Sequence, residues 1–535
     1  MKKFYLPLSF LVLILLTVII YSCSKLYVNH GFRKTYTDVN DVIHSDPHNN
    51  PFFKVHYKNG DVSLLDNWQL NDTKDSISGR GQLFDFNRNQ RQEGELVVGL
   101  DDIAIIETND LSTIKSKDKD RITGLTILTA TNAAMDIVCI TNPKACFGSC
   151  PTFYTEGNIT KNTADAEGFS SAISPSLEYR DLDALQYHTA ARTFDLTMTN
   201  EAFETHMINE IYLQAVPKKD REQIFHDKNG SFYTCGDFIP FNSAVTDSKD
   251  ISASVNSLDD KEYFSDADRD DLTTKEAIVL EFTNLVPGNK GLVINFRQSL
   301  LTTFLLYSGI SYMGNEVGDY FAKIETNRYV KDRLKNPFKR LGTIKLYAWN
   351  SARNKWIQFG DLYETGPIAK NLILAPLPKN INSTKDLKIK IELTKGLWRL
   401  DYLGLTTIKS KAEPLTIYPN KLDVVTGEDY TIDEIARDDD IYLVSLPGNE
   451  YTFQFELPEL PENGNYELFL SSKGYYLEWV RSDWVQRKDL DKLKKMLLND
   501  EQAWKELARE FKSKEHEMET VFWNSKYTNS QHEGL

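Results

Sequence analysis

Alternating apolar and polar residues predict that β-strands make up much of the chain. Near the start, residues 53–57 alternate before Asn59-Gly60, a dipeptide typical of tight hairpin turns. The apolar pattern returns in three further stretches, residues 62–70, 76–86 and 95–108. We therefore predict a β-meander domain over residues 52–120.

Short predicted strands return in the second half of the chain. They fall at residues 343–349, 356–364, 372–375, 387–393, 398–407 and, after an interval, within 440–472. Short strands at regular spacing, rich in aromatic residues, are typical of β-sandwiches and jelly rolls. Residues 331–480 are therefore predicted to form a β-sandwich-like domain.

Apolar residues at helical spacing predict a few helices between these regions. The longest such pattern covers residues 299–327, where Gly309, Gly314 and Gly318 allow a neighbouring element to pack closely. A shorter helix is predicted over residues 181–188. The long helix is predicted to pack on a sheet.

The last segment, residues 481–535, is also predicted to be helical. Asp500 is a suitable N-cap, and apolar residues recur between charges after it. Such an amphipathic segment either closes on a sheet or serves as a docking arm for a partner. The predicted fold class is thus α+β, predominantly β.

Residues 121–330 are predicted to form an α/β domain that includes the cysteine motif and the long helix. The domain begins with an apolar tract over residues 122–140, which contains Asp136. A charged residue at the centre of a bilayer costs about 2.5–3.5 kcal/mol on insertion scales. A buried or interfacial helix therefore fits the tract better than a membrane span, and contact of its surface with lipid stays open.

The N-terminus carries a targeting pattern. Lys2 and Lys3 precede an apolar run over residues 8–20, and the run ends in Ile20-Tyr21-Ser22-Cys23. This ending resembles the lipobox of bacterial lipoproteins. The resemblance implies that residues 1–22 are a signal peptide, that lipid is attached to Cys23, and that residues 23–51 are a tether.

The same resemblance indicates the membrane and its face. Ser24, rather than an aspartate, follows Cys23, which fits sorting to the outer membrane. No acidic run follows Cys23, so the periplasmic face is favoured over the cell surface. Several acyl chains, at about 0.8 kcal/mol per buried methylene, would anchor the chain firmly.

The charge of the chain is inconsistent with nucleic-acid binding. The formal net charge is −15, and it becomes −17 once Lys2 and Lys3 are removed with the signal peptide. An acidic chain without a basic stripe lacks the electrostatic attraction that phosphate backbones require.

Apart from Cys23, the chain has four cysteines, Cys139, Cys146, Cys150 and Cys235. An even number in an oxidising compartment predicts two disulfides. We favour the pairs Cys146–Cys150 and Cys139–Cys235 among three possible connectivities. Redox activity and a zinc site with Cys139 and Cys235 are the alternatives.

Four segments together resemble a family of large uncharacterised bacterial lipoproteins that carry a C-F-G-x-C-P motif. They are residues 145–154 (ACFGSCPTFY), 166–171 (AEGFSS), 396–402 (GLWRLDY) and 474–479 (GYYLEW). The resemblance implies an envelope protein with one architecture throughout. It implies no activity, substrate, cofactor or catalytic residue.

Two groups of residues are candidates for ligand binding. Asp266, Asp268 and Asp270 have the spacing that begins a calcium loop, although no glycine holds the sixth position and Ala277 holds the twelfth. A solvated loop is the alternative. A second group, Trp349, Trp356 and Trp398, could stack on sugars or lie in the core.

No nucleophile, base and orienting group converge in any motif. We therefore predict a non-catalytic scaffold or accessory subunit of an envelope complex, with an outer-membrane protein as partner. A ligand-binding lipoprotein, with glycan as ligand, is the second prediction, and an envelope enzyme is the third. No cofactor is predicted beyond the lipid on Cys23 and the possible calcium ion.

Overall fold

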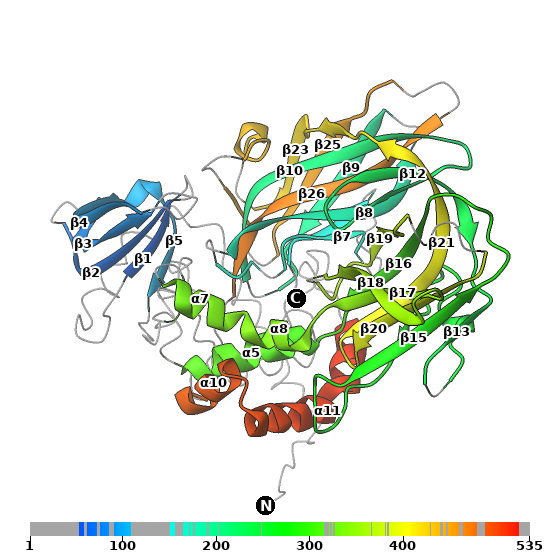
Figure 1. The fold of residues 1–535 in the computed structure, drawn as a ribbon. Helices are drawn as coiled ribbons and strands as arrows, with labels where there is room; N and C mark the ends of the chain where they lie inside the picture. The colour runs from blue at the N-terminus through cyan, green and yellow to red at the C-terminus, as the bar shows by residue number, and fades with distance from the viewer. Residues whose placement is uncertain are drawn as a thin grey trace, which may run out of the picture.

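The computed structural model describes residues 53–523 with gaps, of which the longest are residues 109–149, 156–163 and 479–486. The predicted signal peptide, the tether, the apolar tract 122–140, Cys139 and Cys146 lie outside the described residues. The fold is α+β and predominantly β, as predicted (Figure 1).

The N-terminal strands form a separate five-stranded antiparallel sheet in the order β4-β3-β2-β1-β5. The first four strands pair consecutively, as in the predicted meander, but the fifth pairs with β1 at the opposite edge. Its strands are β1 (Phe53–Tyr57), β2 (Val62–Leu70), β3 (Ser76–Phe84), β4 (Gln90–Gly99) and β5 (Ile103–Thr108), with a 3₁₀ turn at Leu100–Asp102. The alternating residues Val55, Leu65, Ile77 and Val98 are buried in a small core of its own. Figure 1 shows this sheet beside the main body.

Two facing sheets form the upper part of the main body in Figure 1. The first has the order β22-β10-β26-β8 and contains β8 (Tyr179–Thr189), β10 (Glu204–Lys219), β22 (Leu415–Ile417), β26 (Gly464–Glu478) and, paired to β10, β24 (Leu443–Ser445). The second has the order β23-β25-β9-β6-β7 and contains β6 (Thr152–Thr155), β7 (Ala166–Glu167), β9 (Thr193–Thr199), β23 (Lys421–Thr426) and β25 (Glu450–Glu456). Side chains of both sheets share one core cluster.

The other two sheets form the rest of the main body. One has the order β12-β11-β19-β16-β21-β14 and contains β11 (Gln223–His226), β12 (Phe232–Ile239), β14 (Tyr263–Phe264), β16 (Lys290–Gln298), β19 (Asn371–Pro376) and β21 (Trp398–Ala412). The other has the order β13-β15-β20-β17-β18 and contains β13 (Ser243–Val245), β15 (Lys275–Phe282), β17 (Ile344–Asn350), β18 (Lys355–Leu362) and β20 (Leu387–Thr394). These two sheets and the helices share the largest core cluster.

The predicted boundary between residues 330 and 331 does not divide the sheets. Strand β10 pairs with β26 from Glu204↔Glu478 to Lys219↔Gly464, and β16 pairs with β19 and β21. All four sheets of the main body contain strands from both sides of this boundary. The predicted α/β and sandwich domains therefore form one interleaved body.

The α-helices of the described residues gather on one side of the main body (Figure 1). They are α5 (Leu301–Met313), α7 (Arg328–Leu334), α8 (Asn336–Leu341), α10 (Leu490–Leu497) and α11 (Glu501–Trp523). The C-terminal pair, α10 and α11, packs on the body, and Phe511 lies 5.3 Å from Phe304 of α5 between ring centroids. No helix in the described residues has both the length and the apolar composition needed to cross a bilayer.

Two helix predictions are wrong. The helix predicted over residues 299–327 is not continuous: α5 ends at Met313, where Gly314 has φ 58° and a Cβ would lie 2.4 Å from Lys488 Cβ, although Tyr320 and Ile324 are again helical. The predicted helix over residues 181–188 is strand β8, which pairs with β26. Tertiary pairing overrides local helical spacing there.

Candidate functional site

Cys150 and Cys235 are buried, and both are free cysteines in the structure. Their predicted partners, Cys146 and Cys139, lie outside the described residues, so the two disulfides stay predictions. Cys235 lies on β12 in an apolar cluster with Val216 and Phe225, and its Sγ is 3.8 Å from the carbonyl oxygen of Tyr233. Burial raises the pKa of Cys235 to about 12. Burial, together with the neighbouring carboxylates of Glu167 and Glu204, also raises the pKa of Cys150. Both groups are therefore thiols at neutral pH, a poor state for nucleophilic attack.

The predicted calcium loop does not gather its three aspartates around one point. Asp268 Oδ1 accepts hydrogen bonds from the backbone N–H groups of Asp270 and Asp271, at 2.9 and 3.1 Å. Asp270 instead pairs with Arg509 of α11 at 2.7 Å. The segment is a turn with its own internal hydrogen bonds, and it does not bring the three carboxyl groups together, so calcium binding here stays a prediction.

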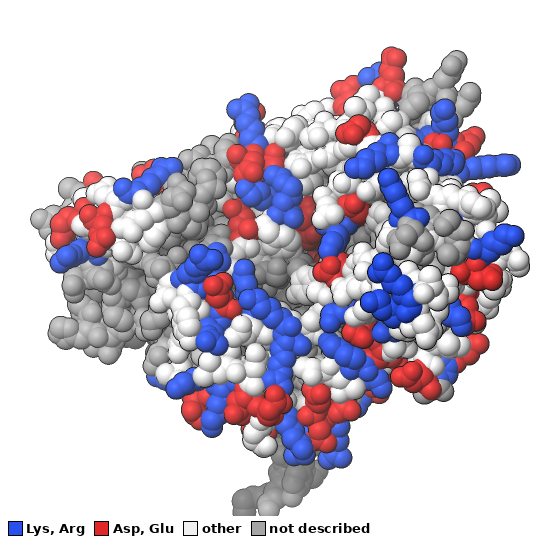
Figure 2. All heavy atoms as spheres, in the orientation of Figure 1, with Lys and Arg blue, Asp and Glu red and all other residues white. Residues whose placement is uncertain are grey.

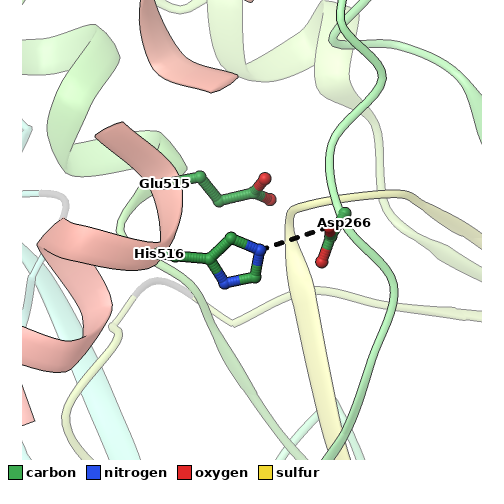
Figure 3. A group of neighbouring side chains, drawn as sticks. All are labelled: Asp266, Glu515 and His516. Carbon is green, nitrogen blue, oxygen red and sulfur yellow. Dashed lines mark hydrogen bonds and ion pairs between the residues drawn. The ribbon is translucent and has the colours of Figure 1, made fainter. Parts of the chain in front are cut away.

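The third aspartate, Asp266, belongs to a different group with Glu515 and His516 of α11 (Figure 3). One ligand atom from each lies within 4.8 Å of the others. Lys512 Nζ donates to Asp266 at 3.0 Å and to Glu515 at 2.8 Å. Although partial burial raises the pKa of Asp266, the hydrogen bonds from Lys512 and His516 lower it overall. The ammonium group of Lys512 thus pairs with both carboxylates, and these ion pairs join α11 to this loop.

The three tryptophans do not form one binding surface. Trp398 is 1% exposed and packs against Phe296 in the core. Trp349 and Trp356 are a half-buried cross-strand pair on the β17–β18 hairpin, with ring centroids 5.3 Å apart. Trp398 is therefore a core residue and not part of a stacking surface shared with the other two.

A cavity of about 820 Å³ lies between the helices and the first sheet. Its walls are mainly apolar and come from the segment after β7 and from helices α5, α7 and α8: Ile173, Leu177, Leu306, Leu334 and Phe338. Its floor is polar and contains Cys150, Glu167, Ser170, Glu204 and Tyr476. This volume and lining are typical of small-molecule sites.

The carboxyl group of Glu167 is the most constrained polar group on the floor. Glu167 is 4% exposed, and its Oε2 accepts hydrogen bonds from the backbone N–H groups of Ile368 at 2.7 Å and Ala369 at 3.2 Å. A Cβ at Gly366 would lie 2.1 Å from Oε2, so a residue with a side chain would displace the carboxyl. Burial is the main reason why the pKa of Glu167 is raised to about 7, although the two amides lower it.

More carboxyl groups lie behind Glu167. Asp183 Oδ2 accepts the backbone N–H of Glu167 at 2.7 Å, and Asp183 Oδ1 accepts from Asn371. The Asn371 amide also donates to Glu364. Burial and the charges of Asp181, Glu364 and Glu167 raise the pKa of Asp183. Several carboxyl groups therefore lie together beneath the floor, and their burial and mutual repulsion favour the protonated, neutral form of each.

Two further carboxylates have partners near the floor. Glu204 accepts or shares a hydrogen bond with His206 Nε2 at 2.8 Å. The Tyr307 hydroxyl donates to Glu478 at 3.3 Å. The first pair lies within β10, whereas the second connects α5 to β26 and so holds the helix to the first sheet.

The mouth of the cavity is basic. Five cationic residues line it: Lys275, Lys335, Lys339, Arg340 and Lys345. Lys275 donates to the Leu341 carbonyl and Thr394, and Arg340 pairs with Glu501. Lys335 and Lys339 are exposed. Figure 2 shows Lys and Arg side chains gathered over the α7–α8 region.

The sequence analysis missed this cavity as a site. Glu167 lies within residues 166–171, which were noted only for their resemblance to other lipoproteins. Its small neighbours, Ala166 and Gly168, were the one local sign that this glutamate could be buried. The remaining lining residues come from distant segments. Local motifs therefore could not have indicated the site.

No protein-family model, no curated protein and no solved structure matches the chain. The resemblance to bacterial lipoproteins therefore stays a prediction, and the function has to be argued from the site.

Proposed function

We propose that the protein is an outer-membrane lipoprotein, anchored through Cys23, that binds an amphipathic small molecule in the cavity. The observation that carries the proposal is the cavity of about 820 Å³, with apolar walls, a polar floor and a basic mouth. Binding rather than catalysis is proposed because burial and nearby carboxylates keep the Cys150 thiol protonated.

The lining favours a ligand with an apolar body over a sugar. Leu306 and Phe338 contribute aliphatic and aromatic surface to the walls, whereas none of the three candidate tryptophans lines the cavity. An acidic group on the ligand could remain at the mouth, near Lys335 and Lys339. The proposal therefore keeps the ligand-binding prediction and replaces glycan by an amphiphile.

Filling the cavity tests the proposal. The Leu306→Trp variant places a larger ring among the walls, and we expect it to weaken binding of the dye N-phenyl-1-naphthylamine at least about tenfold, because the apolar contact area is lost. Dye fluorescence with the purified mature protein measures this. Val286→Trp, at a site that is 77% exposed, is the matched control and should bind as wild type. Wild-type protein that does not bind the dye would contradict the proposal.

The anchor has its own test. Cys23→Ala removes the thiol that carries the lipid, so we expect the protein to move from the outer-membrane fraction to the soluble envelope fraction. Cell fractionation measures the shift, and protease treatment of whole cells reports the face. Retention of the variant in the membrane fraction would contradict lipid anchoring through Cys23.

One observation favours a scaffold role as a second candidate function. Strand β4 is an edge of the N-terminal sheet, and its Val97 is 73% exposed. An edge strand can pair with another chain. Co-purification of an outer-membrane protein that is lost on Val97→Lys would support this role, whereas an isolated monomer would not.

A further inference from the structure

Carboxyl groups lie on and behind the cavity floor without a basic partner. Glu167 lines the floor and Asp183 is buried behind it, and their hydrogen bonds come from backbone and Asn371 amides, not from a cationic side chain. The charged groups that act most strongly on Asp183 are themselves acidic. Buried carboxyl groups are normally paired with a cation or bound to a metal. The floor is therefore electrostatically suited to a positive group that the chain does not supply.

One oxygen atom is available for that group. Glu167 Oε2 is held by two backbone amides, but no N–H or O–H group among the described residues donates to Oε1. The weak Cys150 thiol is the neighbouring donor to the Glu167 carboxyl, and it also lies beside the Ser170 hydroxyl on the floor. A primary ammonium group has three donors and no acceptor, so it can serve a carboxylate oxygen and a hydroxyl oxygen together.

A metal ion fits the floor less well than an ammonium group. Within the described residues, the cluster of three potential metal ligands within 4.8 Å of one another is Asp266 with Glu515 and His516, away from the cavity floor. Glu167 and Asp183 are instead directed to backbone and Asn371 amides. The carboxyl groups thus present one open oxygen, not a coordination shell.

We propose that the ligand of the cavity carries a primary ammonium group on an apolar body, with the ammonium on the floor against Glu167 and Ser170 and the apolar body against α5 and α8. This inference rests on the proposed function, because it assumes that the cavity binds an amphiphile. A charge-assisted hydrogen bond in a buried site is the interaction that selects this ligand class.

Three probes of equal chain length test the inference by calorimetric titration of the mature protein: octylamine, octanol and octanoate. We expect octylamine to bind at least about tenfold more tightly than octanol, and octanoate to bind most weakly. Equal binding of octylamine and octanol would overturn the inference but leave the proposed function standing. Binding of none of the three would overturn both.

Two variants locate the effect. Glu167→Gln keeps the size of the side chain and an oxygen for the Ile368 and Ala369 amides, so we expect it to bind octanol as wild type and to lose the preference for octylamine. Glu276→Gln is the matched control, because Glu276 is buried, accepts from Tyr263 and Ser265 and lies outside the cavity. It should keep the preference. If Glu167→Gln still prefers octylamine over octanol, the assignment of the ammonium site to Glu167 is overturned. If the variant fails to fold, the comparison of the three probes with wild-type protein still tests the inference.

Discussion

The carboxyl group of Glu167 shows how single contacts determine a side chain's chemistry. Two backbone amides hold one oxygen, Gly366 leaves room for it, and the surrounding burial opposes its ionisation. The balance leaves the group close to half ionised at neutral pH, since its pKa is about 7. A charge at this position therefore depends on what else enters the cavity.

The pKa of Glu167 predicts a pH dependence of stability. Its folded pKa is raised above the ordinary value of 4.5, so the folded state holds more protons than the unfolded state between about pH 4.5 and 7. The free energy of unfolding should therefore fall as the pH rises through this window, by up to roughly 3 kcal/mol from this group. Urea unfolding at about pH 5 and about pH 8 measures the change.

The Glu167→Gln variant replaces the titrating carboxyl group by an amide that does not ionise between about pH 5 and pH 8. Its free energy of unfolding should fall less over the same window, whereas Glu276→Gln should keep the wild-type slope. A residual slope is expected because the pKa values of Asp181 and Asp183 are also raised, mainly by burial. Parallel curves for wild type and Glu167→Gln would contradict the assignment.

At the level of residues, the sequence identified side chains with suitable functional groups but did not show whether they are buried. Cys150 and Trp398 were candidates because of their residue types, but burial makes one an inert thiol and the other a core ring. Glu167 was overlooked because its constraint comes from the Ile368 and Ala369 amides, about 200 positions along the chain. Long-range contacts of this kind leave no local pattern.

At the level of elements, periodicity predicted most strands and failed where distant partners decide. The β2 pattern over residues 62–70 matches Val62–Leu70 because its alternation and turn are local. The β8 segment has helical spacing but pairs with β26, almost 300 residues later. Close packing at Gly314 was predicted, but the end of α5 there was not, because the neighbour is Lys488 of the distant C-terminal segment.

Helix α11 provides a test at this level. Glu519 Oε1 accepts the Leu300 N–H at the start of α5 at 2.9 Å, and Oε2 lies 3.3 Å from Arg399 Nε. Because Glu519 is 6% exposed, Glu519→Ala leaves a buried positive charge with one partner fewer, and we expect it to lower the free energy of unfolding by about 3–5 kcal/mol. Chemical denaturation measures this.

Glu517 offers a control on the same helix. It is exposed, so Glu517→Ala should change the free energy of unfolding by less than about 0.5 kcal/mol. Equal effects of the two substitutions would mean that Glu519 does not join α11 to α5 in the way its contacts indicate.

At the level of the whole molecule, one small sheet stands beside a large interleaved body. The N-terminal sheet has its own core, whereas the four remaining sheets exchange strands across most of the chain. The sequence predicted the first unit because its strands are consecutive. It divided the second at residue 330 because the predicted long helix ends there and short predicted strands follow, whereas strand pairing crosses this boundary.

This arrangement predicts two thermal transitions. Ile77→Ala in the core of the N-terminal sheet should destabilise that unit by about 2–5 kcal/mol and lower its transition temperature alone. Ile294→Ala on β16 should lower the other transition alone. Differential scanning calorimetry separates them. One transition shifted by both substitutions would show that the two units unfold together.

The late position of β26 in the chain has a consequence for biosynthesis. This strand lies between β8 and β10, so both keep bare edges until residue 478 has been made and, in an exported chain, delivered across the inner membrane. A chain truncated before β26 would expose unpaired strand edges and would be prone to aggregate instead of folding into a shorter functional protein. Quality-control chaperones and proteases should therefore meet this protein mainly before its last fifty or so residues arrive.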